Sequence, residues 1–118
     1  MYFDSVEELK NIVPVCNGIW NKEYLYEYLV LYSNIKFKEY IGNFFQSYLD
    51  NTDLADLLFS FLLDDYYDGS DCQMGAARLI SNMDRQLLKD KKDLLLQAQK
   101  NEVYWKRPFP HDEHLEWV

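Results

Sequence analysis

The sequence predicts an all-α protein in which about six helices form a compact antiparallel bundle or a short stack of helical hairpins. Hydrophobic residues recur at helical spacing through most of the chain. Only 4 glycines and 3 prolines are present in 118 residues, which leaves little material for strand-connecting turns. A hydrophobic content of 48% can fill one core. We therefore expect a single helical domain over residues 1–118, with 101–118 as a C-terminal strap.

The first two helices are predicted from a capping signal and a hydrophobic stripe. Ser5 and Glu8 have the spacing of a capping box, and Pro14 ends the helix that follows. Asn17-Gly18 breaks the chain. A second helix is expected from about Asn21 to Tyr32. Its buried stripe consists of Tyr24, Leu25, Tyr28, Leu29 and Tyr32.

The third and fourth helices carry the clearest amphipathic patterns. The stripe of the third helix is Phe37, Tyr40, Ile41, Phe44, Phe45, Tyr48 and Leu49. Polar residues 50–53 end this helix and cap the fourth. The buried stripe of the fourth helix is Leu54, Leu57, Leu58, Phe61 and Leu62. Its opposite, solvated face carries Asp53, Asp56, Ser60 and Asp64.

The fifth and sixth helices and a strap complete the predicted fold. A turn at 68–71 leads into a helix that ends near Met83 and buries Ala76, Ala77, Leu79 and Ile80. Asp84 caps a sixth helix that reaches about Lys100 and buries Leu87, Leu88, Leu94, Leu95 and Ala98. The two prolines and three aromatic residues of 103–110 predict an extended strap that packs its rings on the helices.

Charge is distributed unevenly along the chain. The net charge is −8, and no lysine or arginine lies between Lys38 and Arg78. That interval contains eight acids: Glu39, Asp50, Asp53, Asp56, Asp64, Asp65, Asp68 and Asp71. Residues 78–107 hold eight basic and four acidic residues, and they would partly neutralise the acidic middle if the two parts pack together. The overall charge disfavours direct binding to nucleic acid or to an anionic membrane, and favours a basic protein partner.

The acidic turn is the candidate binding surface. Asp64 and Asp65 fall near the C-terminal end of the fourth helix, where the helix dipole disfavours anions and no lysine is near in sequence. The expected partner contacts are Asp64, Asp65, Tyr66, Tyr67, Asp68 and Asp71, with Asp53 and Asp56 as flanking electrostatic guides. The alternative is an ordinary solvated helix junction, with Asp68 and Asp71 placed favourably at the start of the fifth helix.

Tyrosine content favours the binding interpretation, because tyrosine is enriched at protein interfaces and the chain has ten. Four tyrosines lie on predicted buried stripes and are assigned to the core: Tyr24, Tyr28, Tyr40 and Tyr48. Tyr26, Tyr66 and Tyr67 lie off those stripes or at a helix end, so they are the better candidates for contact with a partner.

Other chemistry has little support in the sequence. Residues 64–75 resemble a calcium loop, but Tyr66 and Gly75 occupy two ligand positions. His111 and His114 would need a third metal ligand. Cys16 and Cys72 have no metal-binding or redox spacing and are expected to be reduced. We therefore expect no enzyme, cofactor or metal site. The start of the chain lacks a secretory signal and no apolar run is long enough to span a membrane, so a cytoplasmic location is expected.

Three stretches of the C-terminal half resemble small helical immunity proteins of bacterial polymorphic toxin systems, including those of contact-dependent growth inhibition. They are residues 64–83, 104–110 and 115–117. The resemblance implies an antitoxin that binds the C-terminal domain of a cognate toxin, often a nuclease with a basic cleft. It assigns no contact residue. Two alternatives stay open: an acidic mimic of nucleic acid that inhibits a DNA-binding protein, and a structural subunit that forms a homo-oligomer.

Overall fold

The computed structural model of the chain describes residues 6–32, 34–67 and 70–99. The described residues are mostly helical, which confirms the all-α class. The elements are α1 (Val6–Leu9), β1 (Val15–Cys16), β2 (Ile19–Trp20), α2 (Lys22–Tyr32), α3 (Ile35–Phe45), the 3₁₀ helix η1 (Gln46–Tyr48), α4 (Thr52–Leu62), the 3₁₀ helix η2 (Asp65–Tyr67), α5 (Asp71–Ser81), α6 (Arg85–Asp90) and α7 (Lys92–Gln99).

The helices begin at capping residues that satisfy otherwise unpaired backbone N–H groups. The side chain of Asn51 accepts from the Leu54 N–H at 2.8 Å, and that of Asp84 accepts from the Leu87 N–H at 3.1 Å. Both caps lie where the sequence predicts helix starts. Ser70 caps α5 in the same way, accepting from the Gln73 N–H at 3.3 Å. Ser5 and the strap 101–118 lie outside the described residues.

A short hairpin replaces the simple break expected at residues 17–18. Val15 pairs with Trp20 and Cys16 with Ile19 in an antiparallel arrangement. Asn17 and Gly18 have positive φ angles of 52° and 79°. Two consecutive positive φ angles suit a two-residue hairpin turn, and Asn-Gly is the dipeptide that adopts it most readily. The composition argument against hairpins was therefore wrong at this position.

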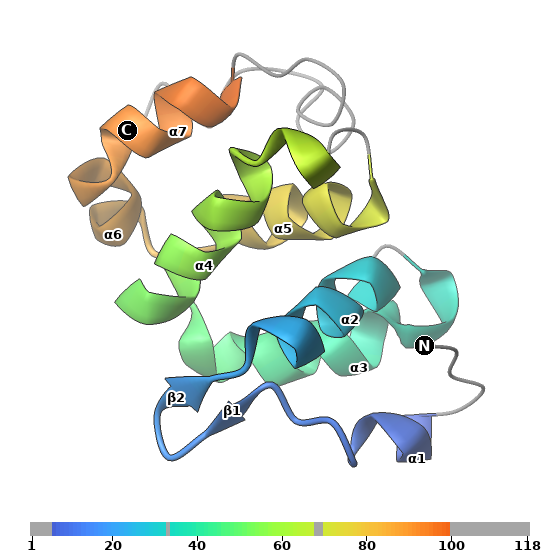
Figure 1. Cartoon of the computed structure of the whole chain (residues 1–118). Coiled ribbons are helices and arrows are strands. Elements are labelled where there is room, and N and C mark those ends of the chain that lie inside the picture. Colours follow the sequence, from blue (N-terminus) through green and yellow to red (C-terminus); the bar gives the residue numbers. More distant parts are fainter. Residues whose placement is uncertain (1–5, 33, 68–69, 100–118) are drawn as a thin grey trace.

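The sixth predicted helix is divided into α6 and α7 at Lys91. The backbone of Lys91 leaves helical geometry, with φ −114° and ψ 26°, and its N–H bonds to the carbonyls of Leu88 and Lys89. Its ammonium bonds to the Asp56 carboxylate at 2.5 Å. Figure 1 shows the chain turning between α6 and α7, so that α7 packs on α4.

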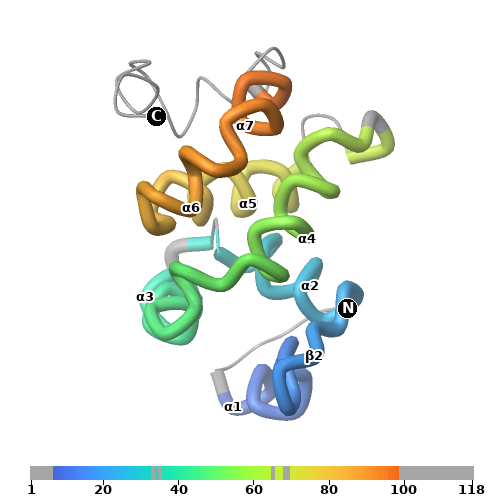
Figure 2. Tube along the Cα trace, turned by 90° about the vertical axis from the view of Figure 1, so that its left-hand side faces the viewer, coloured from blue at the N-terminus to red at the C-terminus, as the bar shows by residue number. Residues whose placement is uncertain are grey.

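The layout places α1 and the β1–β2 hairpin at one end of the molecule and α6 and α7 at the other, as Figures 1 and 2 show from two directions. Between them α5 contacts both α2 and α4. The Tyr28 hydroxyl donates to the Leu9 carbonyl at 3.1 Å and ties α1 to α2. Of the tyrosines assigned to the core, Tyr28 is fully buried, whereas Tyr24, Tyr40 and Tyr48 are partly buried and pack against the core.

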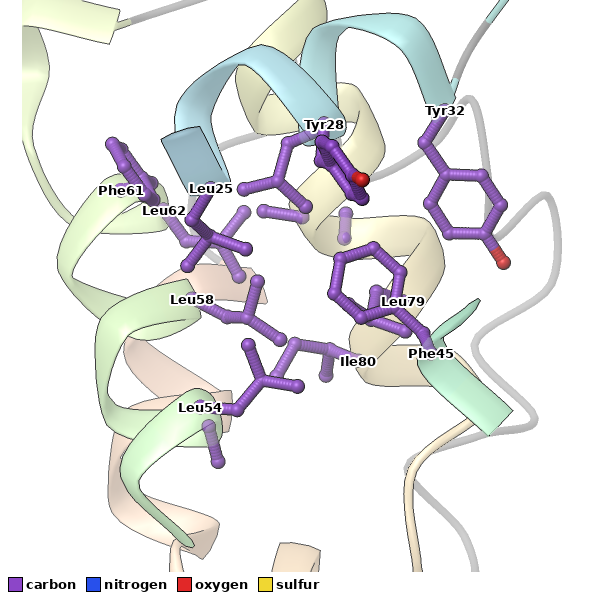
Figure 3. Close-up of a cluster of buried hydrophobic side chains, with 14 of the residues drawn as sticks. Leu25, Tyr28, Tyr32, Phe45, Leu54, Leu58, Phe61, Leu62, Leu79 and Ile80 are labelled. Carbon is purple, nitrogen blue, oxygen red and sulfur yellow. The ribbon is translucent and has the colours of Figure 1, made fainter. Parts of the chain in front are cut away.

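The core is formed mainly where α2, α4 and α5 meet (Figure 3). Leu25, Leu58 and Leu62 lie together near its α2–α4 margin, beside Phe61. The α2–α5 contact is the most extensive, and Gly75 makes it possible. A Cβ added at Gly75 would lie 2.0 Å from the Leu29 carbonyl oxygen.

We expect Gly75→Ala to destabilise the fold by about 3 kcal/mol or more, because the methyl group would force α2 and α5 apart. The matched control is Gly42→Ala in α3, where a Cβ would meet only the Tyr32 ring, at 3.8 Å. This control should be neutral or stabilising by up to about 1 kcal/mol, since alanine is the better helix former. Urea denaturation followed by circular dichroism measures both. Equal stability of the two variants would contradict the close approach.

Candidate functional site

The acidic turn has more internal compensation than the sequence indicates. Asp64 directly follows the C-cap of α4, Leu63. Its carboxylate accepts from the Tyr66 N–H at 2.9 Å and so caps η2. The Asp64 carboxylate lies near the C-terminal end of α4, where a negative charge is unfavourable. It also lies at the start of η2, where a negative charge is stabilising. Among the described residues, no lysine or arginine forms an ion pair with Asp64.

The other described acids of the candidate set also have local roles. Asp53 and Asp71 lie in the first turns of α4 and α5, where the helix dipole favours negative charge. Asp56 pairs with Lys91 across 35 residues of sequence. This pair confirms that the basic later part of the chain neutralises some of the acidic middle. Asp56, nominated as a flanking electrostatic guide, is thus partly compensated within the chain. The side chain of Asp65 and the whole of Asp68 lie outside the described residues.

The local roles of the acidic residues do not explain why Tyr66 is exposed. Its side chain is 85% exposed, the highest value among the large hydrophobic residues that the structure describes. Its ring makes an edge-to-face contact with that of Tyr67, with centroids 5.0 Å apart. Tyr67 in turn contacts Phe61 at 5.1 Å and Tyr26 at 5.9 Å. The three tyrosines nominated from the sequence therefore come together in space.

These rings line a groove formed by α2, η2 and Phe61 of α4. We call it the tyrosine groove; it has a volume of about 680 Å³ and is lined by Lys22, Glu23, Tyr26, Glu27, Phe61, Tyr66 and Tyr67. The Lys22 ammonium lies over the Phe61 ring, 5.0 Å from its centroid. Phe61 is also part of the core, so the groove is built directly on the hydrophobic interior.

Gln73 fixes the turn that carries Tyr66 and Tyr67. This residue of α5 is completely buried. Its amide nitrogen donates to the Phe61 carbonyl at 3.1 Å and to the Asp64 carbonyl at 3.2 Å. The Phe61 carbonyl also accepts from the Asp64 N–H at 3.4 Å, and the Asp64 carbonyl accepts from the Tyr67 N–H at 3.1 Å, so the glutamine adds a second donor to each. The link ties the end of α4 and Asp64, just before η2, to α5.

Cys72 lies beneath the tyrosines. It is buried, and this burial raises the pKa of its thiol to about 12, with the Lys22 ammonium acting in the opposite direction. Burial also raises the pKa of Tyr26 and of Tyr67, with smaller contributions from neighbouring negative charges such as Glu27 and Asp64, respectively. Both phenols are therefore protonated at neutral pH and keep an O–H group that can donate a hydrogen bond. The thiol is unreactive because the thiolate is its nucleophilic form.

Four lining residues of the groove were not among the residues nominated from the sequence. Phe61 was assigned to the core alone, and Lys22, Glu23 and Glu27 had no assigned role. A signal was present, because Glu23 and Glu27 are one helical turn apart and flank Tyr26. The sequence could not predict that α2 lies beside η2, because the tertiary fold brings together segments about 40 residues apart.

The structure also bears on metal binding and on membrane insertion. The described part of the chain contains no group of three histidine, cysteine, aspartate or glutamate side chains placed to hold a metal ion. None of the helices in residues 6–32, 34–67 and 70–99 combines the length and apolar character needed to cross a membrane. His111 and His114 lie outside the described residues.

Comparison with known protein families, with curated proteins and with solved structures finds no match to this chain. The candidate site is therefore assigned on its geometry and chemistry.

We expect Gln73→Met to lower the free energy of unfolding by about 1–3 kcal/mol, because it keeps the volume but removes the buried donor to the Phe61 and Asp64 carbonyls. Amide hydrogen exchange should quicken at residues 63–67. Gln86→Met is the matched control, since Gln86 is exposed on α6 and donates to the Asp90 carboxylate at 3.3 Å. It should change stability by less than about 0.5 kcal/mol. Unchanged exchange in Gln73→Met would rule out its role in holding the turn at Asp64.

Alkylation should distinguish the two cysteines. At pH 8 we expect iodoacetamide to modify the exposed Cys16 in the native protein and to leave the buried Cys72 intact. Both should react in urea. Peptide mass spectrometry locates the modification. Equal rates at the two thiols under native conditions would contradict the burial of Cys72.

Proposed function

We propose that this chain is an immunity protein that binds and neutralises a cognate toxin domain through the tyrosine groove and the adjacent acidic turn. The observation that carries the proposal is Tyr66, an aromatic side chain left 85% exposed yet supported by Tyr67. An exposed tyrosine held by a second ring loses little conformational freedom on binding, and such residues contribute strongly at interfaces. The resemblance of the C-terminal half to immunity proteins supplies the functional class.

Electrostatics supports a basic partner, with a nuclease domain as the proposed target. The net charge of −8 would accelerate the encounter with a positively charged cleft. Exposed Asp53, Asp64 and Asp71 contribute to that field, and Asp56 contributes less because Lys91 neutralises it. Binding strength would come from the desolvated rings, since exposed charges mainly change the association rate.

The proposal includes the finer expectations about the molecule. The helices would form one antiparallel bundle, with residues 101–118 packed on it as a strap. The protein would act in the cytoplasm, without catalysis or a cofactor. Asp65 and Asp68 remain proposed contacts on the sequence argument.

The test requires a large secreted protein encoded in the reading frame directly upstream, whose C-terminal domain is produced in cells together with this chain. The wild type should restore growth and bind the domain in a one-to-one complex. Tyr66→Ala should weaken binding by at least about tenfold, mainly through faster dissociation. Asp64→Asn should mainly slow association at low salt.

The matched control is Asp90→Asn, an exposed acid on α6 that lies with Asp50 and Thr52 near the opposite end of α4. It removes one charge and should preserve binding and protection. Protection and binding kinetics that are unchanged in Tyr66→Ala and Asp64→Asn would eliminate this surface. Competition by nucleic acid, with binding to many basic proteins, would favour the mimic alternative. A mass that rises with concentration would favour a homo-oligomer.

A further inference from the structure

We propose that the tyrosine groove holds an arginine side chain of the partner, in the place where Lys22 now lies over Phe61. The identity of the partner protein rests on the proposed function, but the chemistry of the groove stands on its own residues. Its walls combine aromatic rings with two carboxylates, and one ring face already carries a cation.

The Lys22 contact shows that a cation is accommodated in this groove. The ammonium is 5.0 Å from the Phe61 centroid, within the range at which the ring quadrupole attracts positive charge. Lys22 is the first residue of α2 and is exposed, so its long side chain can leave the ring without disturbing the core. A partner cation could therefore take its position.

The charge of the groove also favours a cation. Glu23 and Glu27 lie one turn apart on α2 with Tyr26 between them in sequence, and all three line the groove. Two carboxylates against one ammonium make the lining net negative. Displacement of Lys22 would leave the exposed Glu23 carboxylate beside the incoming group. An anionic ligand would meet repulsion from the same residues.

Arginine fits this arrangement better than lysine. A guanidinium is planar and can stack on a ring while its edge donates to carboxylates, whereas an ammonium acts as a point charge. It is also less strongly hydrated, so its transfer into a partly aromatic site costs less. Arginines commonly bind phosphate in nucleic-acid-binding proteins. An arginine held in the groove would be unavailable to the substrate of a nuclease.

The test is a nuclear magnetic resonance titration of the full chain with N-acetyl-arginine methylamide. We expect saturable shifts of the backbone amides of residues 22–27 and 66–67, with a dissociation constant on the order of 10 mM. The citrulline analogue has nearly the same shape without the charge, and it should produce no saturable shift. The lysine analogue should bind more weakly than arginine.

Variants of the groove sharpen the test. Lys22→Met removes the competing cation and should strengthen arginine binding roughly threefold, whereas Tyr66→Ala should weaken it by a similar factor. Lys36→Met is the matched control, because Lys36 also lies over a ring, Phe37 at 5.4 Å, but outside the groove. It should leave the affinity unchanged.

Equal shifts with arginine and citrulline, or weaker arginine binding in Lys22→Met, would overturn the inference. These outcomes are separate from those of the toxin experiment. If the toxin domain is bound while the arginine probe is not held at the groove, the arginine inference fails and the immunity function stands. If the probe binds and the toxin domain does not, the immunity function fails.

Discussion

The close approach of α2 and α5 is the constraint on which the rest of the structure depends. Gly75 lets the α5 backbone lie against the Leu29 carbonyl, and no larger residue could occupy that position without moving a helix. Once the two helices are in contact, Cys72 and Gln73 of α5 are buried. Gln73 then reaches the end of α4, while Cys72 lies under Tyr26 of α2 and Tyr67 of η2. The groove is thus a consequence of one tight helix pair.

The sequence was most informative where structure is local. Helical periodicity located α2, α3, α4 and α5, and capping chemistry located the starts at Asn51 and Asp84. The sequence was misleading where one or two residues depart from the helical periodicity around them. Asn17-Gly18 forms a hairpin within a helical protein, and Lys91 interrupts a continuous hydrophobic stripe. Neither departure changes the class of the fold, since both occur at junctions.

The candidate site was predictable in part. Tyr26, Tyr66 and Tyr67 could be nominated because they fall off the hydrophobic stripes, and the structure brings them together. The sequence did not show how the acids are compensated, because a carboxylate can be satisfied by a backbone N–H, a helix terminus or a distant lysine, and linear sequence shows only neighbouring charges. Asp64, Asp71 and Asp56 illustrate these three cases in turn. The contribution of Lys22, Glu23 and Glu27 depended on tertiary contacts.

The tyrosine groove combines one buried core residue with exposed residues that tolerate substitution. Phe61 belongs to the interior, whereas Tyr66, Lys22 and Glu23 are exposed and can be exchanged at little cost in folding energy. A series of substitutions at these positions would leave each successive variant folded. The same helical scaffold can therefore present different binding chemistries when only a few rim residues change.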